Sequence, residues 1–265
     1  MSRSTALVAA AGVAILLVAG VWFYQRGRAV PTSAEQAADD DLWIDLLYSQ
    51  NPKDAAEAAA HVESLGAQAL PLIHATLQDP GADQQRVKAA LKACVIIGTA
   101  AAPAIGEVAE QLPDPALTAE AALALSFMGR GAFEPLRDAL ASDDPVVRRE
   151  ALRSIGKLKE RAPLDSRAVV PLLVKAIQDP DPGVRAVGAT YLGIVHEGGA
   201  PVVAALIGGL TDPEADVRRA AATALGSFTG EAALALPALR KASGDSDPEV
   251  AREAGVALVK LQPPR

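Results

Sequence analysis

Apolar residues recur every three or four positions over most of this 265-residue chain, from about residue 41 to residue 261. This spacing puts them on one face of a helix, so it predicts amphipathic helices rather than strands. Six of these helices share an internal pattern built around a small residue. The central small residues are Ala90, Ala122, Ala151, Gly188, Ala221 and Ala254.

The positions four residues before and after each centre lie on the same helix face. Those before the centre are Arg86, Thr118, Val147, Val184, Val217 and Val250. Those after it are Cys94, Ser126, Ile155, Leu192, Leu225 and Leu258. The last four helices fill these positions with apolar residues, so we expect this face to be buried. Cys94 then belongs to the core and is not a reactive thiol.

A helix-start signal recurs with a similar period. Asp or Asn before Pro suits a helix start, because the side chain caps free N–H groups and Pro needs no partner at the first helical position. The Asp-Pro pairs follow one another at steps of 35, 30, 35, 33 and 35 residues. The predicted starts are Asn51-Pro52, Asp79-Pro80, Asp114-Pro115, Asp144-Pro145, Asp179-Pro180 with Asp181-Pro182, Asp212-Pro213 and Asp247-Pro248.

Pro also recurs in the helix that precedes each start from Asp79 onward, where it predicts a bend because it removes a backbone hydrogen bond. These prolines are Pro71, Pro103, Pro135, Pro171, Pro201 and Pro237. Each unit of the repeat therefore contains two helices. The apolar content of 50% with only 3% aromatic residues suits closely packed helices rich in Ala and Leu.

Two strings identify a family. PLLVKAIQDPDPGVRAVGATYLG (171–193) and LTDPEADVRRAAATALGSF (210–228) resemble HEAT repeats, particularly the bacterial HEAT-like class that includes phycobilisome linker lyases. The resemblance covers roughly residues 41–261 and implies an all-α, right-handed α-solenoid of about seven antiparallel helix pairs. The first pair, at residues 41–66, is atypical, as expected of an end cap.

The N-terminal segment has a different pattern. Ala6 to Tyr24 is a run of 19 residues without a charge, about 28 Å long as a helix, which matches the ~30 Å hydrocarbon core of a bilayer. Aromatic residues close the run, and Arg26 and Arg28 follow it. We therefore expect a single-pass protein of the bacterial inner membrane with an extracytoplasmic solenoid. The alternative is a signal peptide that is cleaved after Gly20.

This interpretation divides the chain into an N-terminal transmembrane signal anchor at residues 1–26, a linker at 27–40 and the solenoid at 41–262. Three of the 25 basic residues and none of the 32 acidic ones precede residue 30. The rest of the chain thus holds 22 basic and 32 acidic residues, a charge of about −10. That balance argues against binding to nucleic acid.

Similarity to HEAT repeats also implies a role for the Val-Arg pairs. In the family this Arg usually pairs with an Asp of a neighbouring inter-helix turn, and the resemblance implies a structural ladder here. It would join Arg148, Arg185 and Arg218 to Asp144, Asp181 and Asp216.

Positions two before and two after each centre point away from the packed face, toward the surface that is concave in such a solenoid. They are rich in basic residues and hold a single acidic one, Glu120. The hypothesis is a groove for an acidic peptide or protein segment; the alternative is an ordinary solvated helix face. The candidate contacts are Lys88, Lys92, Arg149, Arg153, Arg219 and Arg252.

The sequence contains few residues that could form an enzyme active site. The HEAT-like class includes deoxyhypusine hydroxylase, whose di-iron site uses several His-Glu pairs, whereas this chain has one, His196-Glu197. His61 and His74 fit ordinary helix residues, and a single Cys excludes Cys-x-x-Cys sites. We expect no catalytic, cofactor or metal site.

The expected function is a membrane-tethered, non-enzymatic scaffold that binds a protein or peptide partner on its concave surface. One alternative is a HEAT-like enzyme of the lyase or oxidoreductase type, or its accessory subunit. Another is a structural subunit that joins a larger envelope complex through its end repeats.

Overall fold

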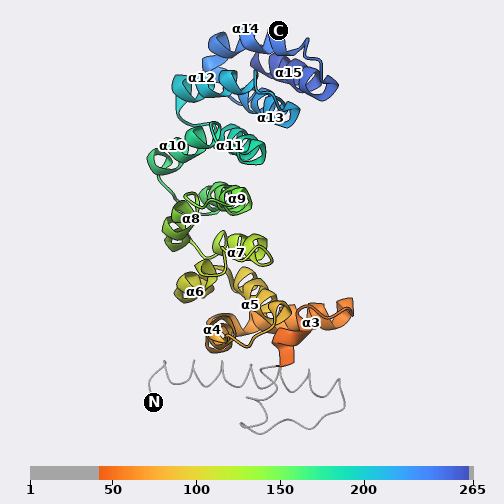
Figure 1. The fold of residues 1–265 in the computed structure, drawn as a ribbon, viewed down its shortest axis with the longest axis vertical. Coiled ribbons are helices and arrows are strands. Elements are labelled where there is room, and N and C mark those ends of the chain that lie inside the picture. The colour runs from red at the N-terminus through yellow and green to blue at the C-terminus, as the bar shows by residue number, and fades with distance from the viewer. Residues whose placement is uncertain (1–41, 263–265) are drawn as a thin grey trace, which may run out of the picture.

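The computed structural model describes residues 42–262, which form α-helices and short 3-10 helices stacked in layers along one long axis (Figure 1). This part of the chain contains no strand. It is an all-helical repeat solenoid, as predicted. The predicted membrane segment, Ala6 to Tyr24, and the predicted linker lie outside the described residues.

Each layer consists of a first and a second helix. The first helices are α4 (Leu70–Gln78), α6 (Ile105–Ala109), α8 (Phe133–Ala139), α10 (Ser166–Ala176), α12 (Gly199–Gly209) and α14 (Ala232–Ala242). The second helices are α3 (Pro52–Leu65), α5 (Gln84–Ile97), α7 (Thr118–Leu125), α9 (Pro145–Arg161), α11 (Pro182–Val195), α13 (Ala215–Leu225) and α15 (Pro248–Leu261). Short 3-10 helices precede four first helices: η1 (Gly66–Ala69), η2 (Gly98–Ala104), η3 (Arg130–Ala132) and η4 (Thr229–Glu231).

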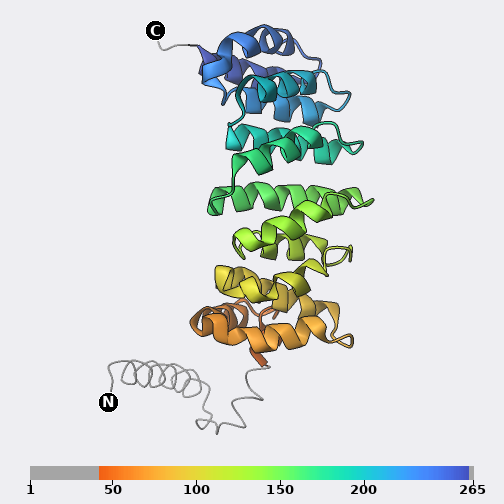
Figure 2. The same cartoon turned by 90° about the vertical axis from the view of Figure 1, so that its left-hand side faces the viewer.

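Six pairs, α4–α5 to α14–α15, follow α3, and helical residues 42–46 stand before α3 in place of a first helix. The second helices pack in a row, α9 against α11, α11 against α13 and α13 against α15. This row lines the side toward which the stack curves, on the right in Figure 1. Figure 2 shows the same layers from the left-hand side of Figure 1.

The predicted central face is buried. All six central small residues are buried, and so are the residues four before and four after them, except Arg86 and Leu258, which are half-buried. Small residues also allow close contact between layers. A Cβ added to Gly193 of α11 would lie 2.6 Å from the Ala224 Cα of α13, so only glycine fits there without a shift.

The predicted helix starts are confirmed at four positions. Asn51, Asp144, Asp181 and Asp247 each accept a backbone N–H at the start of a helix whose first residue is Pro.

The predicted starts at Asp79, Asp114 and Asp212 are wrong, because α5, α7 and α13 begin two to four residues after the Pro that was predicted as their first residue. Each of these side chains accepts the N–H two residues on, from Gly81, Ala116 and Glu214 respectively, in a local turn that precedes the helix. Asp144 makes the same type of bond at a true helix start, so an Asp-Pro pair suits both a cap and a turn before the helix.

The recurrent prolines occupy two kinds of position. Pro171 and Pro237 lie inside α10 and α14, and Pro103 lies inside η2. Pro71 lies in the first turn of α4, where a missing N–H costs nothing, and Pro135 is the third residue of α8. Tolerance of Pro at a helix start thus explains part of the recurrence.

One stretch of the described residues, Gln84–Ala109, is long and apolar enough to cross a membrane by length and composition. In this fold it comprises α5, η2 and α6, with a break at Gly98, whose φ is +59°. α5 packs against α4 and α7. The stretch is therefore part of the stack, and it is separate from the predicted N-terminal segment.

Candidate functional site

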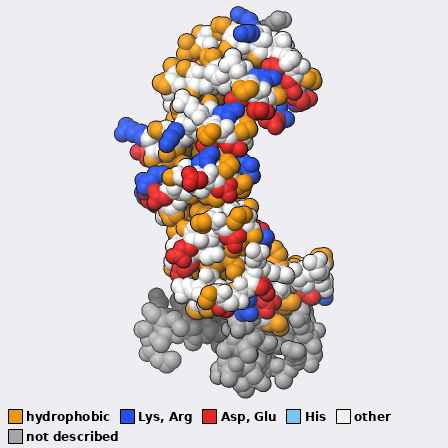
Figure 3. Space-filling model, in the orientation of Figure 1, with side chains coloured by type: hydrophobic (Ala, Val, Ile, Leu, Met, Phe, Trp, Pro, Cys, Tyr) orange, Lys and Arg blue, Asp and Glu red, His pale blue; other side chains and the backbone are white. Residues whose placement is uncertain are grey.

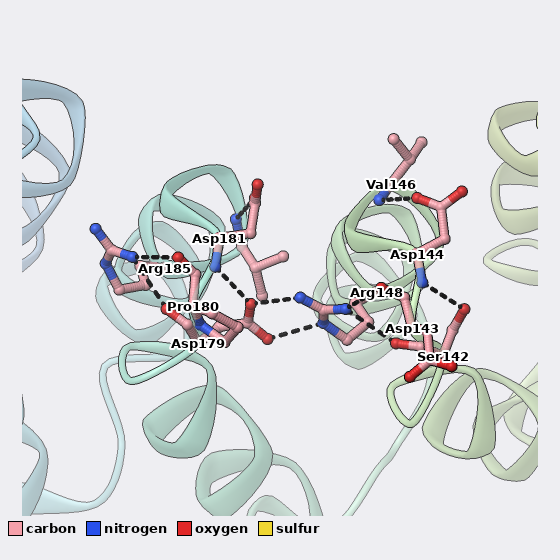
Figure 4. A network of polar contacts seen from close by, with 10 residues as sticks. Ser142, Asp143, Asp144, Val146, Arg148, Asp179, Pro180, Asp181 and Arg185 are labelled. Carbon is pink, nitrogen blue, oxygen red and sulfur yellow. Dashed lines mark hydrogen bonds and ion pairs between the residues drawn. The ribbon is translucent and has the colours of Figure 1, made fainter.

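Three arginines of the second helices join neighbouring layers. Figure 4 shows Arg148 of α9 reaching Asp179, which lies in the turn before α11. Its Nε and Nη2 donate to the two carboxylate oxygens of Asp179 at 2.9 and 2.7 Å. Its Nη1 donates to the carbonyls of Ser142 and Asp143, both at 2.9 Å. The guanidinium of Arg148 therefore connects the turn before α9 to the turn before α11.

The same arrangement recurs twice. Arg185 donates to both oxygens of Asp212 at 2.7 and 2.8 Å, and Arg218 donates to both oxygens of Asp245 at 2.9 Å. All six side chains of this ladder are only 10 to 14% exposed. Bidentate pairs of this kind are the strongest protein ion pairs, and partial burial limits competition from water.

The ladder predicted by the resemblance therefore exists, but its partners were assigned wrongly. Asp144 and Asp181 cap α9 and α11. Asp216 is in contact with Arg219, at 2.8 Å. The acceptors lie 27 to 31 residues after each Arg, in the next turn, and this spacing is the sequence signal that would have identified them.

These contacts shift the pKa values of the ladder. The hydrogen bonds to Asp179, Asp212 and Asp245 raise the pKa of their arginines. The hydrogen bond from Arg218, followed by that from the Asp247 N–H, lowers the pKa of Asp245. The guanidinium and the carboxylate of each pair therefore remain charged at neutral pH. The role of the ladder is to hold neighbouring layers together.

A hollow of about 710 Å³ opens on the concave side, between α9, α11, α13 and α15. Arg149 and Arg153 of α9 line one side, and Arg219 of α13 and Arg252 of α15 line the other. We call this site the arginine hollow. Two carboxylates, Asp216 and Glu253, also line it.

Side-chain size explains where the hollow lies. At the two outward positions α9 carries Arg149 and Arg153, whereas α11 carries Ala186 and Thr190. α13 carries Arg219 and Thr223 there. The small residues of α11 leave space, and the long arginine side chains of the flanking helices surround it.

Each of the four arginines contacts a carboxylate close in sequence. Arg149 and Arg153 lie 3.3 Å from Glu150, Arg219 lies 2.8 Å from Asp216, and Arg252 contacts Glu249 and Glu253. The arginine side chains are 34 to 58% exposed, in contrast to those of the ladder. In Figure 3, basic and acidic side chains lie intermingled over the same layers.

Lys88 and Lys92 lie apart from the arginine hollow, on α5. Lys88 is 3.2 Å from Glu120 of α7, and Lys92 donates to the Leu47 carbonyl at 2.8 Å and lies over the Tyr48 ring. Both side chains therefore stabilise the N-terminal layers. The structure brings together four of the six basic residues predicted from the sequence.

The other candidate chemistry lies in structural positions. Cys94 is fully buried, and burial raises its pKa to about 12, which confirms it as a core residue. His74 of α4 bonds Glu107 of α6 at 2.8 Å and so joins two first helices. Within residues 42–262, no three His, Cys, Asp or Glu side chains lie close enough together to bind a metal ion.

Comparison with solved structures finds the same kind of fold. The Escherichia coli protein YibA is 15% identical over 88% of this chain and 98% of its own, with a TM-score of 0.52. A designed armadillo repeat protein is 19% identical over 84% of this chain and 99% of its own, with a TM-score of 0.45. Another designed armadillo repeat protein, solved in complex with the peptide (KR)4, has the same values. No curated protein sequence matches.

Comparison with protein families gives one match. The family model described as HEAT repeats matches residues 102–166, 133–226 and 203–265, which together span more than half of the chain. These segments contain the whole ladder and the whole arginine hollow. The chain therefore belongs to the HEAT repeat family.

Proposed function

We propose that this protein is a membrane-tethered, non-enzymatic scaffold that binds an acidic segment of a partner protein in the arginine hollow. The observation that carries the proposal is the convergence of four arginines from three helices on one concave site. The chain after residue 30 has a charge of about −10. A basic site on such a body attracts acidic segments selectively, because the rest of the surface repels them.

Two of the ion pairs at the hollow are easily exchanged. Arg219–Asp216 and Arg252–Glu249 are exposed, and exposed ion pairs contribute only about 0–1 kcal/mol each, so a carboxylate of the ligand can replace the intramolecular one there at little cost. Glu150 and Glu249 contact the arginines but do not line the hollow. The lining then holds four positive and two negative side chains.

The membrane tether forms the second part of the proposal. It rests on the uncharged run Ala6 to Tyr24, which is long enough to span a bilayer. We propose an extracytoplasmic, right-handed solenoid that the tether confines to the membrane surface. Nucleic acid is not a proposed partner, because the body is acidic.

The test is binding of a fluorescent octaglutamate peptide to the full chain in detergent, followed by fluorescence anisotropy. The variant R149E/R153E reverses one side of the hollow. Its matched control, R240E/K241E, makes the same change in net charge on α14. We expect R149E/R153E to weaken binding by at least about tenfold and the control to leave it within about twofold.

Equal binding by the two variants would show that the hollow is not the site. Absence of octaglutamate binding to the unmodified chain would contradict the proposed function. Octalysine is the ligand control: the acidic body attracts it, so we expect R149E/R153E to bind it no more weakly than the unmodified chain does.

A further inference from the structure

We infer that the arginine hollow recognises a peptide in an extended conformation, with two acidic clusters separated by a short apolar segment. This inference rests on the proposed function and specifies its ligand. It follows from the positions of the arginines, which come from helices on either side of α11, whereas α11 itself contributes no arginine to the lining.

The distance between the two arginine clusters sets the spacing of the acidic clusters. Packed helices lie about 8–10 Å apart, so α9 and α13, which flank α11, lie about 16–20 Å apart. An extended peptide advances about 3.3 Å per residue. A peptide that crosses the row of second helices therefore needs its acidic clusters about five or six residues apart.

The centre of the hollow favours an apolar residue. α11 contributes Ala186, Thr190 and Ile194 to the lining, and α13 contributes Ala220 and Ala224. Ile194 is 44% exposed although it is a large apolar residue. A central apolar side chain of the ligand would cover it and gain about 25 cal/mol per Å² of apolar surface buried.

The hydroxyl of Thr190 does not require a ligand partner, because it donates to the Ala186 carbonyl of its own helix at 2.8 Å. Thr190 is exposed at the middle of the site. It is therefore a position where added volume blocks the hollow without disturbing the core.

The experiment compares two peptides of one composition, each with four Glu, one Leu, two Gly and one Ser. The spaced peptide is Glu-Glu-Gly-Leu-Gly-Ser-Glu-Glu, and the contiguous peptide is Gly-Ser-Glu-Glu-Glu-Glu-Leu-Gly. Affinity is measured by competition against fluorescent octaglutamate bound to the full chain. We expect the spaced peptide to compete at least about tenfold better.

A pair of variants tests the centre of the hollow. T190W fills it, and T190V keeps the side-chain volume while removing the hydroxyl. We expect T190W to reduce the affinity of the spaced peptide to that of the contiguous one and T190V to change neither affinity. Circular dichroism and the unfolding midpoint confirm that both variants fold.

Equal affinities of the two peptides would overturn this inference while leaving the proposed function intact. So would an unchanged preference in T190W. If octaglutamate and both peptides fail to bind, the proposed function fails as well.

Discussion

At the level of single residues, Arg185 is the middle arginine of the ladder. Its guanidinium donates to both oxygens of Asp212 and to the carbonyls of Asp179 and Pro180. Removing it leaves a carboxylate that is only 10% exposed without its cation. Such a group loses its charge-assisted hydrogen bonds and keeps most of its desolvation cost.

We predict that Arg185→Ala lowers the free energy of unfolding by about 2 kcal/mol, which urea denaturation monitored by circular dichroism would measure. The control is Arg137→Ala, since the Arg137 side chain is 46% exposed and contacts Glu134 and Asp138 on its own helix. We expect this variant to leave the midpoint nearly unchanged. Equal losses in the two variants would contradict the structural role of the ladder.

The ladder also predicts acid sensitivity. The hydrogen bond from Arg218, followed by that from the Asp247 N–H, lowers the pKa of Asp245 in the folded state. The unfolded chain then binds a proton at a higher pH than the folded chain. The stabilisation by Asp245 is therefore complete above its ordinary pKa of about 4 and is lost as the pH falls through the lowered value.

We predict that the stability difference between the unmodified chain and Asp245→Asn is largest near pH 7 and shrinks below about pH 4. Urea denaturation of both proteins from pH 7 to pH 3 would measure it. A difference that stays constant over this range would show that Asp245 does not titrate with folding.

At the level of helices, glycine allows close contact between layers at several positions, of which Gly193 is one. Gly193 of α11 faces Ala224 of α13, and an added Cβ would lie 2.6 Å from the backbone Cα and 2.8 Å from the Cβ of Ala224. The clash involves backbone, so no side-chain rotation relieves it. The two helices would have to separate.

We predict that Gly193→Ala destabilises the fold by about 1–3 kcal/mol through this overpacking. The matched control is Gly255→Ala in the middle of α15, where an added Cβ meets nothing within 4 Å. The control should stabilise the fold by about 0.5–1 kcal/mol, because Ala favours the helix. Thermal unfolding would show a lower midpoint for Gly193→Ala and a higher midpoint for Gly255→Ala than for the unmodified chain.

The buried face of each helix could be predicted from the sequence, whereas the residue at which each helix begins could be predicted only in part. The central columns around Ala151 and Ala221 are buried because apolar spacing alone fixes the inner face of a helix. The start of α13 could not be predicted, since Asp212 suits both a cap and a local turn. In the structure Asp212 accepts from the Glu214 N–H and from Arg185, and the second partner comes from the preceding layer.

The arginine hollow was predictable only in part for the same reason. Helix periodicity places Arg149 and Arg219 on the outward face, and in the structure both line the arginine hollow. Periodicity does not show that Lys92 holds the Leu47 carbonyl, because that contact depends on how the first layer packs. The sequence feature that indicates the position of the hollow is the pair of small residues Ala186 and Thr190, at positions where α9 has arginines.

At the level of the whole molecule, the ladder separates the stack into C-terminal layers that it joins and N-terminal layers that it does not reach. It runs from Arg148 to Asp245 and so clamps the layers of α9 to α15. At the matching positions α7 has Ala119 and α15 has Ala251, so no guanidinium extends the ladder there. In a solenoid each layer contacts only its neighbours, and local stability follows local contacts.

We predict that native-state amide exchange is slowest in α11 and α13 and faster in the short helices α6 and α7. Hydrogen exchange with mass spectrometry would measure the protection, and Arg185→Ala should speed exchange in α11 and α13 more than in α5. Protection of α6 and α7 equal to that of α11 would contradict this division of the stack.

The central claim is that an acidic segment lies in the arginine hollow. The most direct test is photo-crosslinking of the spaced peptide, with a diazirine analogue of its central Leu, to the full chain in detergent. Mass spectrometry then locates the modified residue. Attachment within residues 186–194 of α11 is the predicted result, and attachment outside α9 to α15 would contradict the account.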